Sequence, residues 1–297
     1  MHCKAVRLRP ARAIQAALWC LCAASVLMMA AAAKPSAAAT DAPVSAVHVR
    51  RDVSYGPLRE QRLDLFVSSD TPAGAAGGLL PILVFAPPQA ARSRHYDNVA
   101  LWAAHHRMIG VVMHRRDDST PPWERGPQDF AAMLAWMQAN ARAQGGDPQH
   151  VIVMGADLGG TQLMNYLAHH EYWCCQGPAV AAAALIGSAV NLTAPITQSR
   201  QPVPGAGGAA QSLTDPTHSD LTGLDSIYVP IFIGSPLHPT DAQRRAAVQL
   251  QQELCRRGRC PTLRFFGERD VAAALSSFDT PNEEASRQLL AWIQNLH

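Results

Sequence analysis

The chain has 297 residues, of which 48% are hydrophobic and 16% are charged, and its formal net charge is +2 at pH 7. This balance shows no basic face of the kind that nucleic-acid-binding proteins carry, and it places the chain among globular proteins. The length that remains after an N-terminal leader fits one α/β domain with a single large core.

The first 36 residues have the features of a secretory signal peptide followed by a flexible lead-in. Four Lys and Arg residues lie within the first 12 positions, and residues 13–33 carry no charge and end in a run of alanines. Cleavage between about residues 30 and 40 would send the mature chain to the periplasm or out of the cell, with no stable membrane span. A retained transmembrane anchor is the alternative, because the apolar run is close to spanning length.

Residues 46–297 are predicted to form a single domain in which strands alternate with helices. Apolar runs and alternations predict strands at 47–50, 63–67, 81–86, 108–113, 151–154, 180–186, 231–233 and 262–266. Helical spacing predicts helices at 97–107, 127–143, 160–169, 241–257 and 282–296. This order predicts an α/β fold with a mostly parallel, doubly wound sheet and helices on both faces.

Two connecting segments have distinctive composition. Residues 191–226 are rich in Gly, Pro, Ser and Thr without clear periodicity, which predicts a cap-like or flexible loop. Residues 114–118, which read His-Arg-Arg-Asp-Asp after a buried strand, are predicted to form a solvated rim.

Four cysteines lie outside the leader: Cys174, Cys175, Cys255 and Cys260. An even number in an exported protein favours disulfides over metal ligation. Cys255 and Cys260 bracket a short loop that could close locally. A bridge from Cys174 or Cys175 to that loop is the alternative, and buried free thiols are a third, so the connectivity stays open.

The most informative motif is Gly155-Ala156-Asp157-Leu158-Gly159-Gly160, directly after the apolar run 151–154. Its spacing is that of a nucleophile elbow, G-x-S-x-G, in which a strand turns sharply into a helix and exposes one side chain. The residue at the tip is Asp157 instead of Ser. A hydroxyl can be activated into an acylating nucleophile by a neighbouring base, whereas a carboxylate does different chemistry or none.

Three segments carry a resemblance to a known superfamily. They run from Tyr55 to Phe66, from Asp129 to Trp136 and from Gly145 to Val151, the last with Gly-Gly-Asp-Pro before the elbow. Together they resemble the α/β-hydrolase fold, and within it the secreted esterase/lipase branch with acetyl-esterase, feruloyl-esterase and formamidase-like members. The resemblance covers nearly all of the mature chain. It implies carboxylic-ester-hydrolase ancestry, a Ser-acid-His triad and no cofactor.

Each triad position that the resemblance implies carries a different residue here. Asp157 stands at the nucleophile position, and Asp270 stands where the base His is expected. The acid position falls at Leu237 or His238, and no histidine occurs between His238 and His297. A triad needs a nucleophile held by a base that is itself oriented. The sequence therefore predicts a degenerate triad.

The oxyanion loop is altered as well. Where the family has His-Gly-Gly after the third strand, this chain has Phe85-Ala86-Pro87-Pro88-Gln89. An oxyanion hole is built from N–H groups aimed at the developing charge, and proline has no N–H. Gln89 is left as the candidate donor of this loop. The backbone N–H of Leu158, which follows the nucleophile position, is the other candidate.

Four interpretations of this region remain open. The first is a non-catalytic protein, a pseudoenzyme that binds a small ester-like molecule or a protein partner. The second is an active hydrolase that uses Asp157 as nucleophile, with chemistry like that of haloalkane dehalogenases and epoxide hydrolases. The third is a ligand or metal site built from Asp157, Asp270 and His238 at the carboxyl ends of the strands. The fourth is an esterase with a displaced nucleophile, Ser188 or Thr161.

Overall fold

The computed structural model describes residues 46–70, 78–88, 94–116, 124–188, 190, 223–237, 241–281 and 284–296. The chain divides into two compact units, Met1–Pro43 and Val44–His297, and all described residues lie in the second. The predicted signal peptide, the lead-in and residues 191–222 of the predicted cap-like loop lie outside the described residues. None of the helices in the described ranges is both long enough and apolar enough to cross a membrane.

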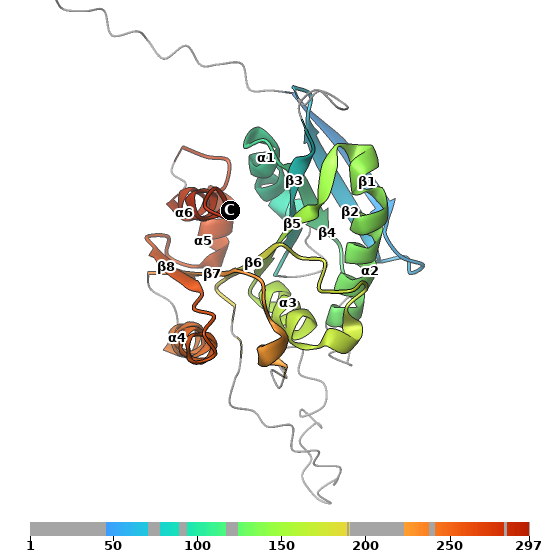
Figure 1. The fold of residues 1–297 in the computed structure, drawn as a ribbon. Coiled ribbons are helices and arrows are strands. Elements are labelled where there is room, and N and C mark those ends of the chain that lie inside the picture. The colour runs from blue at the N-terminus through green and yellow to red at the C-terminus, as the bar shows by residue number, and fades with distance from the viewer. Residues whose placement is uncertain are drawn as a thin grey trace, which may run out of the picture. The chain divides into compact units, whose positions relative to one another are not determined.

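The described strands form an eight-stranded sheet in the order β1-β2-β4-β3-β5-β6-β7-β8 (Figure 1). β2 pairs antiparallel with both β1 and β4, whereas all pairings from β4 to β8 are parallel. The predicted mostly parallel α/β sheet is confirmed. The strands are β1 (Val47–Ser54), β2 (Arg62–Ser68), β3 (Leu80–Ala86), β4 (Ile109–Met113), β5 (Gly146–Ala156), β6 (Ala182–Ile186), β7 (Ile231–Pro236) and β8 (Thr262–Phe266).

Helices cover both faces of the sheet, because successive side chains of a strand point to opposite sides. In β3, Ile82 and Val84 enter one hydrophobic core, while Leu83 and Phe85 enter the other. The first core also takes side chains from α2, α3 and α4, and the second takes side chains from α1, α5 and α6 (Figure 1). The helices are α1 (Asp97–His105), α2 (Arg125–Asn140), α3 (Leu158–Ala168), α4 (Asp241–Arg256), α5 (Val271–Ser277) and α6 (Glu284–Ile293), with short 3-10 turns at Ala141–Gln144, His170–Tyr172 and Leu224–Ser226.

Two elements differ from the sequence-based prediction. The strand predicted at 47–50 to be half-buried is longer, and β1 is mostly exposed because it forms the edge of the sheet and pairs only with β2. Helix α5 is not among the predicted helices. The sequence does indicate a helix here, because Asp270 can serve as an N-cap and is followed by the helix formers Ala272, Ala273 and Ala274.

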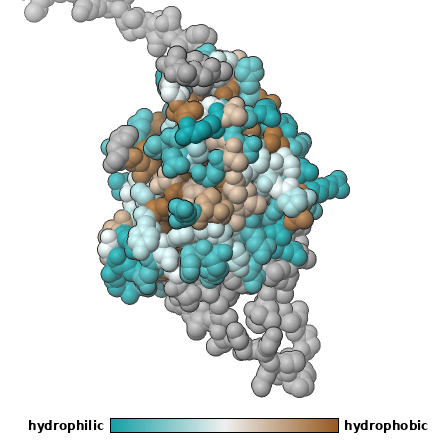
Figure 2. All heavy atoms as spheres, turned by 45° about the vertical axis from the view of Figure 1, so that its right-hand side comes forward, coloured by the Kyte–Doolittle hydropathy of each residue, from teal (hydrophilic) through white to brown (hydrophobic). Residues whose placement is uncertain are grey.

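Single exposed hydrophobic side chains occur over the described surface, as is normal for folded proteins. On the face turned forward in Figure 2, hydrophobic residues gather near the middle and hydrophilic residues surround them. Two of the exposed residues adjoin regions of interest. Leu237 follows the carboxyl end of β7 at the predicted acid position. Leu79 precedes the amino end of β3, on the opposite side of the sheet.

The cysteines resolve into one disulfide and one adjacent pair of thiols. Cys255 and Cys260 form the disulfide, so the loop between them closes locally and the long-range bridge is wrong. Cys174 and Cys175 are free, with their Sγ atoms 2.7 Å apart. Burial, together with the hydrogen bond to Cys175, raises the pKa of Cys174 to about 12. Because the thiolate is the reactive form, Cys174 is a poor nucleophile at neutral pH.

Candidate functional site

The turn between β5 and α3 has the geometry of an elbow. Asp157 stands at its tip with φ 47° and ψ −117°, a strained conformation for a residue other than glycine. Its backbone N–H donates to the carbonyl of Ile186 on β6 at 2.9 Å. Its own carbonyl accepts from the N–H groups of Gly160 and Thr161, both at 3.1 Å. The neighbouring strand and the first turn of α3 therefore hold Asp157 in place.

Close packing behind the tip leaves no room for a Cβ at Gly159 or Gly160 in the first turn of α3. A Cβ on Gly160 would lie 1.8 Å from Ser188 Oγ, and a Cβ on Gly159 would lie 2.3 Å from the carbonyl oxygen of Ala86. The second contact shows that the end of β3 lies against the start of α3. The elbow and the oxyanion loop of the predicted site are therefore neighbours, as the resemblance implies.

The side chain of Asp157 is exposed, yet protein atoms crowd it. Loss of hydration raises the pKa of Asp157 above the ordinary value of an aspartate. No charged group of the described residues is a cause of this shift. Asp157 therefore binds a proton more readily than a solvated aspartate does.

The oxyanion loop is held by a buried arginine. Arg115 is 3% exposed, its Nη2 donates to the carbonyl oxygen of Pro87 at 2.6 Å, and its Nη1 donates to Gln162 Oε1 on α3. Pro87 and Pro88 contribute no N–H, and Gln89 lies outside the described residues. Leu158 is the first residue of α3, where backbone N–H groups have no partner within the helix. Its N–H is the donor that the described part of this site offers.

Arg115 also corrects the prediction of a solvated rim at 114–118. Arg115 is buried, and Arg116 is half-buried with its Nε 2.9 Å from Asp129 Oδ1 on α2. Asp117 and Asp118 lie outside the described residues. Sequence reasoning missed Arg115 because its bonds to the Pro87 carbonyl and to Gln162 join residues far apart in the chain.

The residue at the predicted base position has a structural role. Asp270 is the N-cap of α5, where its Oδ1 accepts from the backbone N–H of Ala273 at 2.7 Å and its Oδ2 accepts from Arg269 Nε at 2.9 Å. The Ala273 N–H and the Arg269 guanidinium hold the pKa of Asp270 below its usual value. These contacts commit the Asp270 carboxylate to the start of α5, and a ligand or metal site shared by Asp157, Asp270 and His238 stays a prediction.

The other predicted site residues divide into two groups. His238 lies outside the described residues, so its predicted part in the site stays a prediction. Ser188 and Thr161 are described, and both are buried. The Oγ of Ser188 is enclosed behind Gly160, and the Oγ1 of Thr161 faces the Asp157 carbonyl at 3.4 Å. Neither hydroxyl can reach a substrate, so the displaced-nucleophile interpretation is wrong for both.

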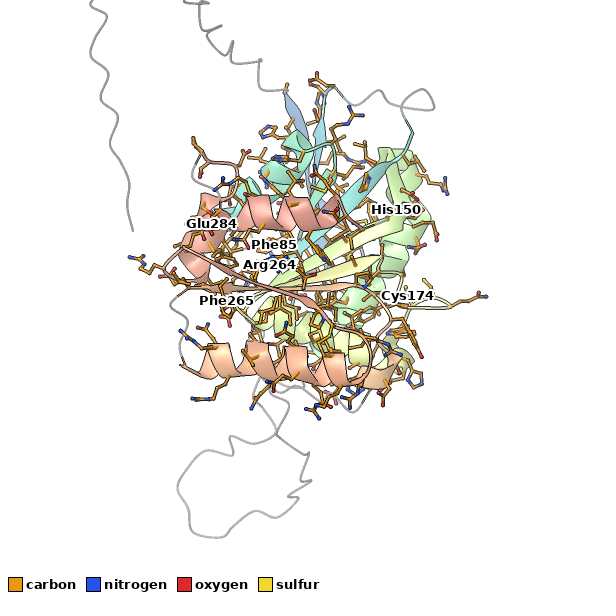
Figure 3. All side chains as sticks on the ribbon, turned by 60° about the vertical axis from the view of Figure 1, so that its left-hand side comes forward. Phe85, His150, Cys174, Arg264, Phe265 and Glu284 are labelled. Atoms are coloured by element: carbon orange, nitrogen blue, oxygen red, sulfur yellow. A yellow bond between two sulfur atoms is a disulfide. The ribbon has the colours of Figure 1, made fainter. Side chains whose placement is uncertain are left out.

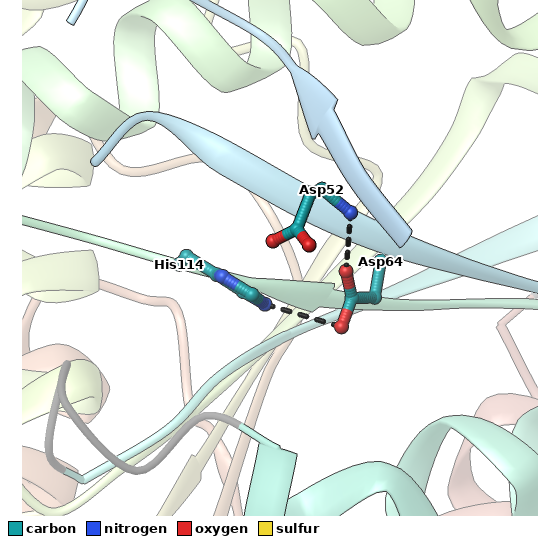
Figure 4. A group of neighbouring side chains, drawn as sticks. All are labelled: Asp52, Asp64 and His114. Carbon is teal, nitrogen blue, oxygen red and sulfur yellow. Dashed lines mark hydrogen bonds and ion pairs between the residues drawn. The ribbon is translucent and has the colours of Figure 1, made fainter. Parts of the chain in front are cut away.

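Among the described residues, one group of three side chains has metal-ligand spacing: Asp52, Asp64 and His114 (Figure 4). Asp64 is fully buried and accepts from the Asp52 N–H and from Arg51 Nη1, each at 2.8 Å, with His114 Nε2 3.3 Å away. Arg94 pairs with Asp52 at 2.6 Å. Burial opposes ionisation of Asp64, but these donors outweigh it and lower its pKa. Two arginines already compensate the carboxylates, so this group is an ion-pair network that ties β1 to β2.

We expect Gly160→Ala to lower the free energy of unfolding by about 1–3 kcal/mol, because the added methyl overlaps Ser188 Oγ. Urea denaturation measures the cost. In a Ser188→Ala background the same substitution should cost less, since the nearest clashing atom is gone. Equal costs in both backgrounds would show that the contact with Ser188 does not limit the packing of the elbow.

We expect Asp157→Asn to raise the free energy of unfolding at pH 7. A pKa that is raised in the folded state makes folding less favourable once the pH exceeds the ordinary aspartate value, and the penalty is complete above the folded pKa. The gain should therefore disappear as the pH is lowered to about 3, below the ordinary aspartate pKa. Denaturation curves at several pH values measure it.

Asp270→Asn is the matched control, because the pKa of Asp270 is lowered. That substitution should reduce stability at pH 7, and its effect should also fade in acid. If both substitutions changed stability in the same direction at pH 7, the assignment of Asp157 as a dehydrated carboxyl group would be refuted.

Of the comparisons with known proteins, the one with solved structures supports the fold. No protein-family model matches the sequence, and no curated protein matches it. Solved structures do match. A truncated carbohydrate esterase from gut microbiota has a TM-score of 0.65 at 13% identity, covering 86% of this chain and 98% of its own. The carboxylesterase Cest-2923 from Lactobacillus plantarum WCFS1 has a TM-score of 0.60 at 16% identity, covering 84% and 97%.

A third structural match is described as an α/β hydrolase. MGS-M1, an α/β-hydrolase enzyme from a Medee basin deep-sea metagenome library, has a TM-score of 0.61 at 12% identity, and the match covers 85% of this chain and 98% of that one. At such identities the likeness concerns the fold. With its parallel sheet, its strand-turn-helix elbow and these structural relatives, the chain has the α/β-hydrolase fold that its motifs predict.

Proposed function

We propose that this protein descends from carboxylic-ester hydrolases, no longer hydrolyses esters, and binds a small ester-like molecule at the elbow. The observation that carries the proposal is Asp157. The elbow keeps its strained backbone, but its tip presents a carboxyl group with a raised pKa where ester hydrolysis needs an activated hydroxyl.

Two further features support the loss of hydrolysis. The base position is filled by Asp270, whose carboxylate caps α5 and carries a lowered pKa, so it is a weak proton acceptor. The oxyanion loop has two prolines, and the Pro87 carbonyl is fixed by Arg115. Loss of one oxyanion donor typically slows ester hydrolysis by about a hundred- to thousandfold. With Asp270 in the base position, that position offers no histidine to activate a water molecule.

The remaining groups suit recognition of a carbonyl. A protonated carboxyl group donates one hydrogen bond through its O–H, and a raised pKa increases the fraction of Asp157 in that form. The Leu158 N–H, at the start of α3, lies one residue further along the chain and has no partner within the helix. An ester carbonyl that accepts from both groups would be bound without being attacked. Binding should tighten as the pH falls, because protonation of Asp157 supplies the donor.

An aspartate nucleophile is the second candidate function. It is favoured by the exposure of Asp157 at the tip of the elbow, where dehalogenase-like and epoxide-hydrolase-like chemistry places a carboxylate. Such chemistry still needs a base to activate the hydrolytic water. In the sequence, His238 is the histidine nearest to the predicted acid position. The expected base position weighs against this candidate, because Asp270 occupies it and caps α5.

We expect the purified protein to hydrolyse p-nitrophenyl acetate and p-nitrophenyl butyrate no faster than Asp157→Ala does. Asp157→Ser should be equally inactive, because the base is missing as well as the nucleophile.

Methyl butyrate should raise the melting temperature of the native protein more at pH 5 than at pH 7. The same ester should give a pH-independent and smaller shift with Asp157→Ala.

The controls separate the candidate functions. Each variant must show the near-UV circular dichroism and elution volume of the native protein. Hydrolysis restored in Asp157→Ser would show that a base and an oxyanion hole exist, and it would overturn the proposal. A covalent adduct on Asp157 after incubation with 1,2-epoxybutane or 1-bromobutane, found by peptide mass spectrometry, would establish the aspartate nucleophile instead.

We also propose that the protein is exported to the periplasm or secreted. The proposal is supported by the basic and then apolar composition of the first 36 residues, and by the Cys255–Cys260 disulfide, a bond that persists in oxidising compartments. We expect the full chain, expressed in a bacterial host with two membranes, to yield a periplasmic form that lacks about 30–40 N-terminal residues by intact mass. An uncleaved chain that stays in the membrane fraction would instead establish the retained anchor.

A further inference from the structure

A pocket of about 840 Å³ lies at the amino-terminal ends of the parallel strands, opposite the end that carries the elbow. It is bordered by residues at the amino ends of the parallel strands, whereas Asp157 follows the carboxyl end of β5. The last turn of α6 and the residues after it form another wall. The lining residues are Leu79, Pro81, Asp147, Gln149, His150, Ile152, Ala181, Pro230, Thr262, Trp292, Ile293, Asn295 and Leu296.

The location follows from the direction of the strands. Figure 3 shows His150 near the amino-terminal ends of the strands, and Phe265, near the carboxyl end of β8, on the opposite side. Seven residues separate His150 from Asp157 along β5, and a strand rises about 3.3 Å per residue, which places them roughly 23 Å apart. This pocket is therefore separate from the elbow.

Most of the lining residues are apolar. Pro81, Ala181 and Pro230 are small residues at or beside strand starts, which leaves space between the sheet and the side chain of Trp292. Ile152 is 4% exposed and belongs to the second hydrophobic core, as does Trp292 at its margin. A cavity of this volume, with apolar walls and few polar groups, is typical of sites for small organic molecules.

Two of the polar lining residues, Asp147 and His150, form a pair, and the His150 side chain is 64% exposed. Asp147 Oδ1 accepts from the backbone N–H of Gln149 at 2.9 Å, and Asp147 Oδ2 lies 2.5 Å from His150 Nδ1. Burial opposes ionisation of Asp147, but the bonds from His150 and Gln149 outweigh it and lower the pKa of Asp147. An ionised carboxylate only accepts hydrogen bonds, so His150 Nδ1 carries the proton. In neutral His150, Nε2 is then the acceptor.

We propose that this pocket binds a compact apolar molecule, of aromatic size, that carries a hydroxyl group, with the hydroxyl donating to His150 Nε2. Asp147 fixes the tautomer and the orientation of the imidazole. Trp292 and Ile152 cover the apolar body of the ligand. The proposal does not depend on the function proposed for the elbow, because neither Asp157 nor α3 lines this pocket.

The test compares 2-naphthol with 2-methoxynaphthalene, which has the same ring system and no hydroxyl donor. We expect 2-naphthol to bind the native protein about three- to tenfold more tightly, the range that one neutral hydrogen bond supplies. Equilibrium dialysis measures both affinities. His150→Phe should abolish the preference while keeping the ring volume, and Ala181→Leu should weaken the binding of both probes by filling the pocket.

Matched controls exclude other sites. His48→Phe changes an exposed histidine on β1 and should leave both affinities unchanged. Equal affinities of the two probes for the native protein would overturn the proposal, and so would a preference that survives His150→Phe. If Ala181→Leu does not fold, the probe pair and His150→Phe still decide the outcome. A failure here would leave the esterase and pH results at the elbow untouched, so the two proposals fall separately.

Discussion

The backbone conformation of Asp157 is the constraint on which the rest of the elbow depends. A residue other than glycine at φ 47° and ψ −117° costs about 1–3 kcal/mol, and it persists only where its surroundings determine it. Here the surroundings are the Ile186 carbonyl on β6, the first turn of α3, and the packing of Gly160 against Ser188. None of these contacts involves the side chain at the tip. The shape therefore survives when that side chain is exchanged, and the shape alone does not report on activity.

The polar groups near the elbow are largely committed to holding the fold. The buried guanidinium of Arg115 satisfies the Pro87 carbonyl and Gln162, and a ligand that recruited it would leave a buried carbonyl unpaired. Asp270 is bound to the start of α5 in the same way. The groups that remain for a ligand, within the described residues, are the Asp157 carboxyl and the Leu158 N–H. That pair can orient a carbonyl, but it cannot move a proton to and from water as a triad does.

Local patterns were enough to predict most of the fold, and non-local contacts explain what they missed. The apolar run at 81–86 and the spacing from Gly155 to Gly160 identified β3 and the elbow, because each is set by neighbouring residues. The burial of Arg115 depends on a proline carbonyl 28 positions earlier in the chain, which no periodicity records. The sequence around Asp270 indicates a helix N-cap, but Asp270 also falls at the position where the family has its base histidine, and it was therefore predicted to belong to the catalytic site. Gln89 and His238 lie outside the described residues, and their roles stay predictions.

β5 joins two polar sites that are physically independent. At its carboxyl end stands Asp157, at its amino end stand Asp147 and His150, and the residues from Val151 to Ala156 between them are buried. At roughly 23 Å and an effective dielectric constant of about 20, two unit charges interact by less than about 1 kcal/mol. A change of charge or residue at the elbow therefore leaves the Asp147–His150 pair almost unaffected. The Gly-Gly-Asp-Pro segment, which marks the resemblance in the sequence, has its own role in the structure, because Asp147 within it orients His150 at the mouth of a pocket. The loss of hydrolysis that we propose at one end of the strand thus places no restriction on recognition at the other.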